Sequence, residues 1–281
     1  MKNALINWLF LGMLVVMCTT SCKTEYEKVR TSGNADLIYK KAYEYYEEGR
    51  YVKSQGLFEL VIPSYRGKKE LEDIYFKYAD TYFQDKQYLL SAYYYKNFST
   101  TFPNSEKREE AEFMSAFSNY NISPNPKLDQ IATTKAIEDF QLYINTFPES
   151  PRVADANRLI DELRIKLEQK ALNEAELYYN LRQYRAAVLS GQNLLKEFPE
   201  TKNGEYIRYL LVKANFNWAE NSVIGKQQER YENVKKFAGE FQKKYNKSEY
   251  KAEVSQMLEK SLSKIKSLND ERYKNLSLIH I

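Results

Sequence analysis

The sequence is poor in the residues from which most enzyme and metal sites are built. It has one histidine, His280, and two cysteines, Cys18 and Cys22, which both lie near the N-terminus. So few cysteines and histidines exclude a disulfide framework, a Cys-based zinc site and a catalytic Cys–His pair. A glycine-rich phosphate loop is missing as well. Chemistry by carboxylates alone stays open, but the sequence favours a protein that is not an enzyme and binds no metal.

Glycine and proline are also scarce, and neither sign of charge is in large excess. The 9 glycines and 7 prolines among 281 residues leave few turns, which suits long helices. The 42 basic and 38 acidic residues are nearly balanced and mixed along the chain, which argues against nucleic acid as a partner. Tyrosine is abundant instead, and its 25 copies need either a core or a binding groove to contact.

The first 21 residues have the composition of a signal peptide. Lys2 precedes a mostly apolar run from Ala4 to Met17, which is too short to span a bilayer comfortably. Small and polar residues then lead into Cys22. This segment resembles a bacterial lipoprotein signal, in which cleavage occurs just before a cysteine that then carries lipid. The small residue Ser21 suits such cleavage.

The resemblance implies a covalent lipid on Cys22, and no other cofactor is expected. Residues 22–34 would then form a short polar tether. Thr19 departs from the usual pattern, which prefers an aliphatic residue there, and an ordinary secretory signal with a chance cysteine is the alternative. No Asp follows Cys22, so the inner-membrane retention signal known in enterobacteria is absent, and we expect the outer membrane.

Three stretches of the chain repeat one another. Residues 42–51 recur as 79–88 and again as 175–184, each with a small residue, an aromatic residue three positions later, and a Tyr at the end. Each copy reads as a helix, a tight turn and a second helix. The pattern resembles the tetratricopeptide repeat, in which small residues let paired helices approach closely.

A second motif, Phe-Pro-x-Ser/Thr, ends these repeats. It occurs at 102–105, 147–150 and 198–201, and 245–248 resembles a copy without the proline. Proline disfavours helix at the residue before it, so the second helix should stop at Phe, and the hydroxyl residue should cap the next helix. We therefore predict an all-α superhelical solenoid over residues 35–266, followed by a tail at 267–281. Its elements are helix pairs at 35–63, 68–103, 105–148, 151–199 and 202–245 and a capping helix at 249–266.

The order of these features resembles the BamD family of outer-membrane assembly lipoproteins over about residues 10–265. The resemblance implies a lipid-anchored scaffold on the periplasmic side of the outer membrane. It implies two kinds of partner: a BamA-type barrel protein, bound mainly by the C-terminal repeats, and unfolded β-barrel substrates, received by the N-terminal repeats. A periplasmic repeat protein that coordinates cell-envelope or cell-division processes is the alternative, and acylation of Cys22 separates the two.

The first helices of the N-terminal pairs offer a place for an apolar peptide. Aromatic rings can bind such a peptide by stacking and burial, and the sequence favours a groove, although each residue could instead pack between repeats. The candidates are Tyr39, Tyr43, Tyr46, Asp80, Phe83, Phe117 and Tyr120. The charged helix after Ser150 reads as a solvated face with internal ion pairs or, alternatively, as a docking surface for the barrel protein.

Overall fold

The structure, a computed structural model, describes residues 24–279 and the side chains up to residue 270. The described residues contain helices and no strand, which confirms the predicted all-α fold class. The predicted signal peptide (residues 1–21) and lipid-bearing Cys22 lie outside the described residues.

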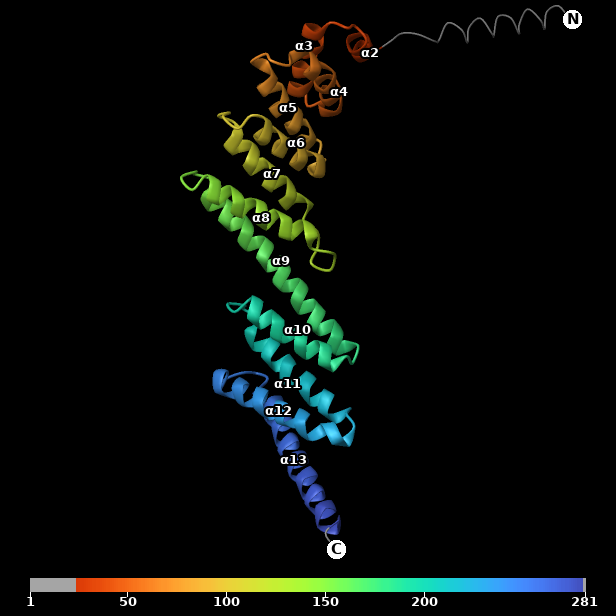
Figure 1. Cartoon of the computed structure of the whole chain (residues 1–281), viewed down its shortest axis with the longest axis vertical. Helices are drawn as coiled ribbons and strands as arrows, with labels where there is room; N and C mark the ends of the chain where they lie inside the picture. Colours follow the sequence, from red (N-terminus) through yellow and green to blue (C-terminus); the bar gives the residue numbers. More distant parts are fainter. Residues whose placement is uncertain (1–23, 280–281) are drawn as a thin grey trace, which may run out of the picture. The chain divides into compact units, whose positions relative to one another are not determined.

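The chain forms two compact units, and in each of them consecutive helices pack side by side (Figure 1). Within the described residues, unit 1 comprises 24–123 and 132–160, and unit 2 comprises 124–131 and 161–279. The helices of the first half of the chain are α2 (Glu25–Arg30), α3 (Ala35–Glu47), α4 (Tyr51–Val61), the 3₁₀ helix η1 (Ile62–Tyr65), α5 (Glu70–Gln84), α6 (Tyr88–Thr101), α7 (Arg108–Ile122) and α8 (Ile131–Thr146). Those of the second half are α9 (Val153–Asn180), α10 (Tyr184–Glu197), α11 (Gly204–Glu220), α12 (Ile224–Lys244) and α13 (Lys251–Ile279).

The helices α3 to α12 fall within the ranges of the five predicted pairs, but both ends of the chain need a correction. The range 22–34, predicted to be a polar tether, contains α2, whose Val29 is buried in the core of unit 1. The helix α13 continues to Ile279 rather than ending at 266, and so extends into the predicted tail.

Small residues bring the paired helices together as the repeats predict. Ala42, Ala79 and Ala175 have no exposed surface, and neither do Ser54 and Ser91 on the second helices. The hydroxyl of Ser54 also donates a hydrogen bond of 2.8 Å to the carbonyl of Ala42, so the small residue of one helix is bonded directly to that of its partner. Any larger side chain at these five positions would push the helices apart.

The turn inside each repeat ends the first helix with one residue in the left-handed conformation. This residue is Gly49 (φ 71°), Lys86 (φ 60°) and Arg182 (φ 59°) in the three matching repeats. The amide after it bonds back five residues, as from Arg50 to the carbonyl of Tyr45 at 2.8 Å, which is the Schellman arrangement of a helix end. Glycine fits this position freely, whereas Lys86 and Arg182 occupy it at a cost.

The junction motif ends the second helices as predicted. Phe102 and Phe198 are the C-caps of α6 and α10, and Tyr245 adopts nearly the same backbone angles at the end of α12 without a following proline. The predicted role of the hydroxyl residue needs a correction, however. The residue that precedes α7 is Lys107, which makes no side-chain cap, and Ser105 lies two residues earlier.

The junction hydroxyl instead joins neighbouring repeats. It accepts a hydrogen bond from the amide two residues later, as from Asn203 to Thr201 at 3.0 Å. It also donates to a glutamate on the first helix of the preceding pair, as from Thr201 to Glu168 at 2.6 Å. The same bridge joins Ser150 to Glu109 and Ser105 to Glu72. Each hydroxyl therefore fixes where the next helix pair begins relative to the last one.

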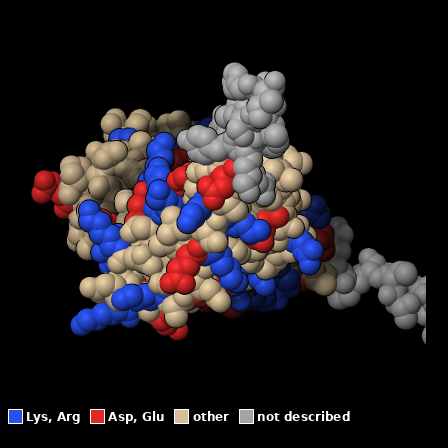
Figure 2. Space-filling model, turned by 90° about the horizontal axis from the view of Figure 1, so that it is seen from below, with Lys and Arg blue, Asp and Glu red and all other residues tan. Residues whose placement is uncertain are grey.

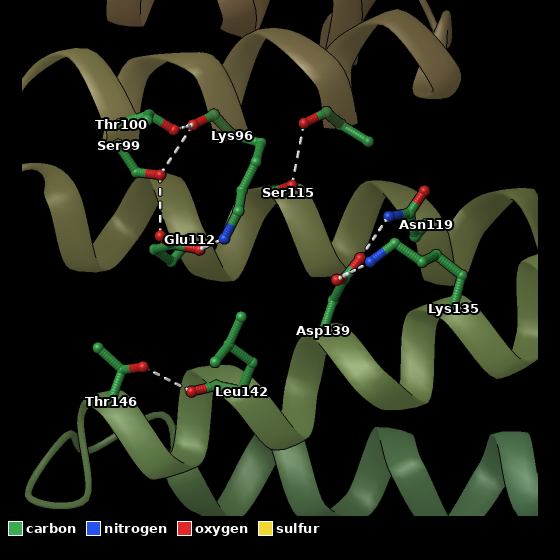
Figure 3. A network of polar contacts seen from close by, with 11 residues as sticks. Lys96, Ser99, Thr100, Glu112, Ser115, Asn119, Lys135, Asp139, Leu142 and Thr146 are labelled. Atoms are coloured by element: carbon green, nitrogen blue, oxygen red, sulfur yellow. Dashed lines mark hydrogen bonds and ion pairs between the residues drawn. The ribbon is translucent and has the colours of Figure 1, made fainter.

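Charged and polar residues on α6, α7 and α8 add further bonds between repeats (Figure 3). Glu112 of α7 accepts hydrogen bonds from Lys96 and Ser99 of α6, at 2.7 and 2.8 Å. Asp139 of α8 accepts one from Asn119 of α7 at 2.7 Å. Side chains of α7 thus bond both to the helix before it and to the helix after it, which links α6, α7 and α8.

We predict that Thr201→Val destabilises the protein by roughly 1.5 kcal/mol, because it removes a charge-assisted hydrogen bond while keeping the side-chain shape. Urea unfolding followed by circular dichroism measures the change. Thr146→Val is the control, because the Thr146 hydroxyl bonds only within its own helix, to the carbonyl of Leu142. Equal stability of the two variants would contradict a role for the bridge.

Candidate protein-binding surfaces

The seven groove candidates lie on the first helices of the three pairs in unit 1. Tyr39, Tyr43 and Tyr46 belong to α3, Asp80 and Phe83 to α5, and Phe117 and Tyr120 to α7. All are at least partly buried. Their contacts divide them into two groups. In one group, side chains form hydrogen bonds between helices, and in the other, aromatic rings contact one another in a row.

Asp80 joins three helices through hydrogen bonds. It is only 9% exposed, and it accepts hydrogen bonds from the hydroxyls of Tyr46 on α3 and Tyr95 on α6, the latter at 2.8 Å. Burial, together with the nearby carboxylate, raises the pKa of both tyrosines, so their hydroxyls remain donors at any physiological pH. Asp80 is therefore a structural bridge between repeats, and its carboxylate already has partners.

Asp73 has a similar role at a neighbouring site on α5, and the sequence reasoning missed it. It accepts hydrogen bonds from Tyr43 of α3 and from Lys107, the residue before α7. Burial alone would raise the pKa of Asp73, but the bonds from Lys107 and Tyr43 outweigh it and hold the pKa below the usual value of an aspartate. The signal available in the sequence was its spacing: Asp73 lies two helical turns before Asp80 and so on the same face of α5.

The remaining candidates form a row of aromatic rings. The rings of Phe83 and Phe117 have centroids 5.8 Å apart, and those of Phe117 and Tyr120 are stacked at 5.7 Å. Phe83 also contacts Tyr88 at 5.5 Å. Tyr39 is separate from this row and stacks on Tyr65 at 5.2 Å. The row of Phe83, Phe117 and Tyr120 therefore joins three of the seven candidates across α5 and α7 through ring contacts.

We predict that Asp73→Asn destabilises the protein at pH 7 and that the difference disappears in acid. Because the pKa of Asp73 is lower in the folded state than in the unfolded state, its ionised form stabilises the fold above the unfolded-state pKa. That contribution is lost as the pH falls through the folded-state pKa. Urea unfolding of both proteins between pH 7 and about pH 3 measures it. Exposed Asp161→Asn should change little at any pH, and a pH-independent loss in Asp73→Asn would contradict the ionic explanation.

Charges of both signs are interspersed on the face that Figure 2 shows, with no large patch of one sign. A smaller basic cluster occurs in unit 2, where α10, α11 and α12 meet. A pocket of about 470 Å³ there is lined by three arginines and by no carboxylate. Its lining residues are Arg182, Gln183, Tyr184, Arg185, Ala186, Trp218, Asn221 and Arg230.

Trp218 lines this basic pocket beside Arg230. The guanidinium of Arg230 lies 4.3 Å from the centre of a Trp218 ring and donates a hydrogen bond to Ser222. A second, smaller pocket of about 170 Å³ shares Trp218 and Arg185 and adds the apolar side chains of Leu189 and Phe237. The basic pocket and a second pocket of mixed apolar and polar lining therefore share one indole ring.

The charged helix α9 also borders a cavity. A groove of about 660 Å³ lies between α9 and the junction that follows α10, with Ile165 and Phe198 among acidic and basic side chains. One α9 carboxylate is used internally, because Glu168 accepts hydrogen bonds from Thr201 and Asn203. The predicted internal ion pairs are represented by Arg158 and Asp155, at 3.8 Å.

The comparison with known families fits this arrangement of helix pairs. The family model of outer membrane lipoproteins named YfiO matches residues 32–204. The chain belongs to the YfiO family of outer membrane lipoproteins. A protein of Aquifex aeolicus that carries the name outer membrane protein assembly factor BamD is 22% identical over 211 residues, which cover 74% of this chain and 68% of the relative. The predicted resemblance to BamD-type lipoproteins is thereby confirmed.

Membership of the YfiO family associates the chain with the outer membrane and with protein assembly. Among residues 24–279, no helix is both long enough and apolar enough to cross a bilayer. The same described residues contain no cluster of three or more His, Cys, Asp or Glu side chains placed to hold a metal ion.

Proposed function

We propose that the protein is a non-catalytic scaffold of the β-barrel assembly machinery. An acylated Cys22 would anchor it to the periplasmic side of the outer membrane. Unit 2 would bind a BamA-type barrel protein, and unit 1 would receive unfolded β-barrel substrates. The observation that carries the proposal is the family match over residues 32–204, because it covers the repeats that hold the aromatic row and reaches the junction after α10.

The pocket around Trp218 supports the assignment of the barrel protein to unit 2. Trp and Arg are the residues that most often contribute large binding energies at protein interfaces. Arg182 and Arg185 are exposed, and no described carboxylate pairs with either of them. A partner that presents carboxylates beside an apolar side chain would pair with the arginines and contact Leu189 and Phe237.

The row of Phe83, Phe117 and Tyr120 supports the assignment of substrates to unit 1. Unfolded barrel segments are rich in aromatic side chains, and rings spaced by 5 to 6 Å can stack with them. Tyr43, Tyr46 and Asp80 have a different role in this proposal. Their hydrogen bonds hold α3 on α5 and so keep the neighbouring helices in place.

We predict that Arg182→Gly weakens binding of the barrel protein about 10-fold without loss of stability. The substitution removes a guanidinium from the pocket, yet glycine suits the left-handed turn better, so stability should stay the same or rise by up to about 1 kcal/mol. Affinity purification from detergent-solubilised outer membranes, with the BamA-type protein quantified, measures the binding. If the wild-type chain does not recover that protein, the proposed function is wrong.

Lys86→Gly is the matched control for this experiment. It changes the equivalent turn residue in unit 1, also from a basic residue at positive φ to glycine. Its thermal stability should respond in the same way, while recovery of the barrel protein stays at the wild-type level. A loss of binding in both variants would show that the turn, rather than the arginine, is responsible.

We predict that Phe83→Ala combined with Phe117→Ala weakens binding of a barrel-protein C-terminal peptide at least 10-fold, because two adjacent stacking surfaces are lost. Fluorescence anisotropy of a labelled peptide measures the affinity, and circular dichroism checks that the variant is folded. Tyr93→Ala is the control, since this ring on α6 is 62% exposed and lies outside the row. Unchanged affinity in the folded double variant would remove the row from the proposal.

A further inference from the structure

The short helix α2 is firmly attached to unit 1. Val29 is 5% exposed within the core, and the ring of Tyr26 lies 6.1 Å from that of Tyr45. Glu25 forms an ion pair of 2.7 Å with Lys41 of α3. Thr24 caps the helix by accepting a hydrogen bond from the amide of Glu27 at 3.3 Å. The repeats are thus already in contact with the chain at its first described residues.

Gly56 of α4 provides the space in which Tyr26 fits. A β-carbon at this position would lie 2.6 Å from the Tyr26 hydroxyl oxygen, closer than real contacts allow. The equivalent positions of the other matching repeats hold Tyr93 and Leu189, which are 62% and 52% exposed. Only the first of these repeats omits the side chain, although glycine inside a helix costs about 1 kcal/mol. The space on the second helix that accommodates Tyr26 of α2 is therefore specific to the first repeat.

The attachment leaves very little chain between the repeats and the predicted lipid. Only Lys23 separates Cys22 from Thr24. Two residues span at most about 7 Å, so a lipid on Cys22 would hold α2 next to the bilayer surface. A flexible tether of the length predicted from sequence would have left the orientation of unit 1 free.

The outer face of α4 beside α2 presents exposed apolar side chains. Val52, Gly56 and Leu60 are spaced by one helical turn and share a stripe. Tyr26 covers the middle of this stripe, while Val52 and Leu60 on either side are 62% and 43% exposed. Apolar side chains of this kind gain free energy at a membrane interface.

We propose that α2 and the outer face of α4 form a membrane-contacting surface that fixes the orientation of unit 1 on the lipid bilayer. The occupant of this surface is the headgroup region of the membrane into which the lipid on Cys22 inserts. The inference rests on the proposed acylation of Cys22 and adds a rigid connection between that lipid anchor and unit 1. Arg30 of α2 forms an ion pair with Glu27 of the same helix, so we expect the contact to depend on the anchor and on apolar side chains rather than on net charge.

The experiment places one fluorescent probe on unit 1 of the acylated protein in phosphatidylcholine vesicles. Val52→Cys carries a nitrobenzoxadiazole label, and lipids with a spin label near the headgroup quench it. Leu142→Cys is the matched position, because it is 49% exposed and lies on α8, at the opposite end of unit 1 from α2 (Figure 1). We expect quenching at residue 52 to exceed that at residue 142 at least three-fold.

A second change tests whether α2 causes the orientation. Gly56→Leu introduces the residue that α10 has at the equivalent position and should displace Tyr26, so quenching at residue 52 should fall to the level at residue 142. Tyr26→Ala should act in the same way without adding bulk to α4. Gly239→Leu, at an exposed glycine with open space around it, should leave quenching unchanged.

The outcomes separate this inference from the proposed anchor. Protein that floats with the vesicles but is quenched equally at both positions overturns the fixed orientation alone. Strong quenching at residue 52 that survives both Gly56→Leu and Tyr26→Ala also overturns it. Protein that does not float with vesicles overturns the acylation of Cys22 and this inference with it.

Discussion

The structure depends on the close approach of paired helices at positions that hold only small side chains. Ala42, Ala79 and Ala175 have no exposed surface, and a hydroxyl of the partner helix bonds the carbonyl of Ala42 directly. A single pair of this size cannot bury its apolar face alone, so each pair needs the next one. The spacing of the pairs therefore matters as much as their contents, and the junction hydroxyls of Ser105, Ser150 and Thr201 set it by bonding a glutamate of the preceding pair.

Most of the fold follows from patterns that act within one repeat. The small residues, the turn tyrosines and the Phe-Pro junctions predict the helix pairs because each reflects local backbone chemistry or helix periodicity. The prediction of a polar tether before Ala35 was wrong for a related reason. The segment before Ala35 is polar in composition, and its membership of the core rests on two residues, Tyr26 and Val29, that contact partners far along the chain. Composition cannot report such contacts.

The candidate groove illustrates the same limit. The sequence placed Tyr43, Tyr46 and Asp80 on one surface because their helical positions agree, and the structure brings Tyr46 and Asp80 into direct contact. Sequence alone cannot distinguish a tyrosine hydroxyl that bonds an aspartate of the next repeat from one that is available to a ligand. The partner of Tyr43, Asp73, became evident only once α3 and α5 lay side by side. The basic pocket was missed because Arg182, Trp218 and Arg230 come from three separate helices or turns.

Equivalent positions in a repeat protein provide an internal standard for recognising special sites. Where all copies have the same need, they should hold the same kind of residue, and a departure requires a local reason. At the turn position, Gly49 is the relaxed choice, while Lys86 and Arg182 both occupy it at a conformational cost, with φ of 60° and 59°. On the outer face of the second helix, Gly56 is the departure, and its reason is visible in Tyr26. The turn position thus holds a basic side chain in two of the three copies, and the outer face of α4 lacks a side chain beneath α2. The repeats thus keep a common framework, and a copy departs from it where it makes an additional contact, as Gly56 does with Tyr26.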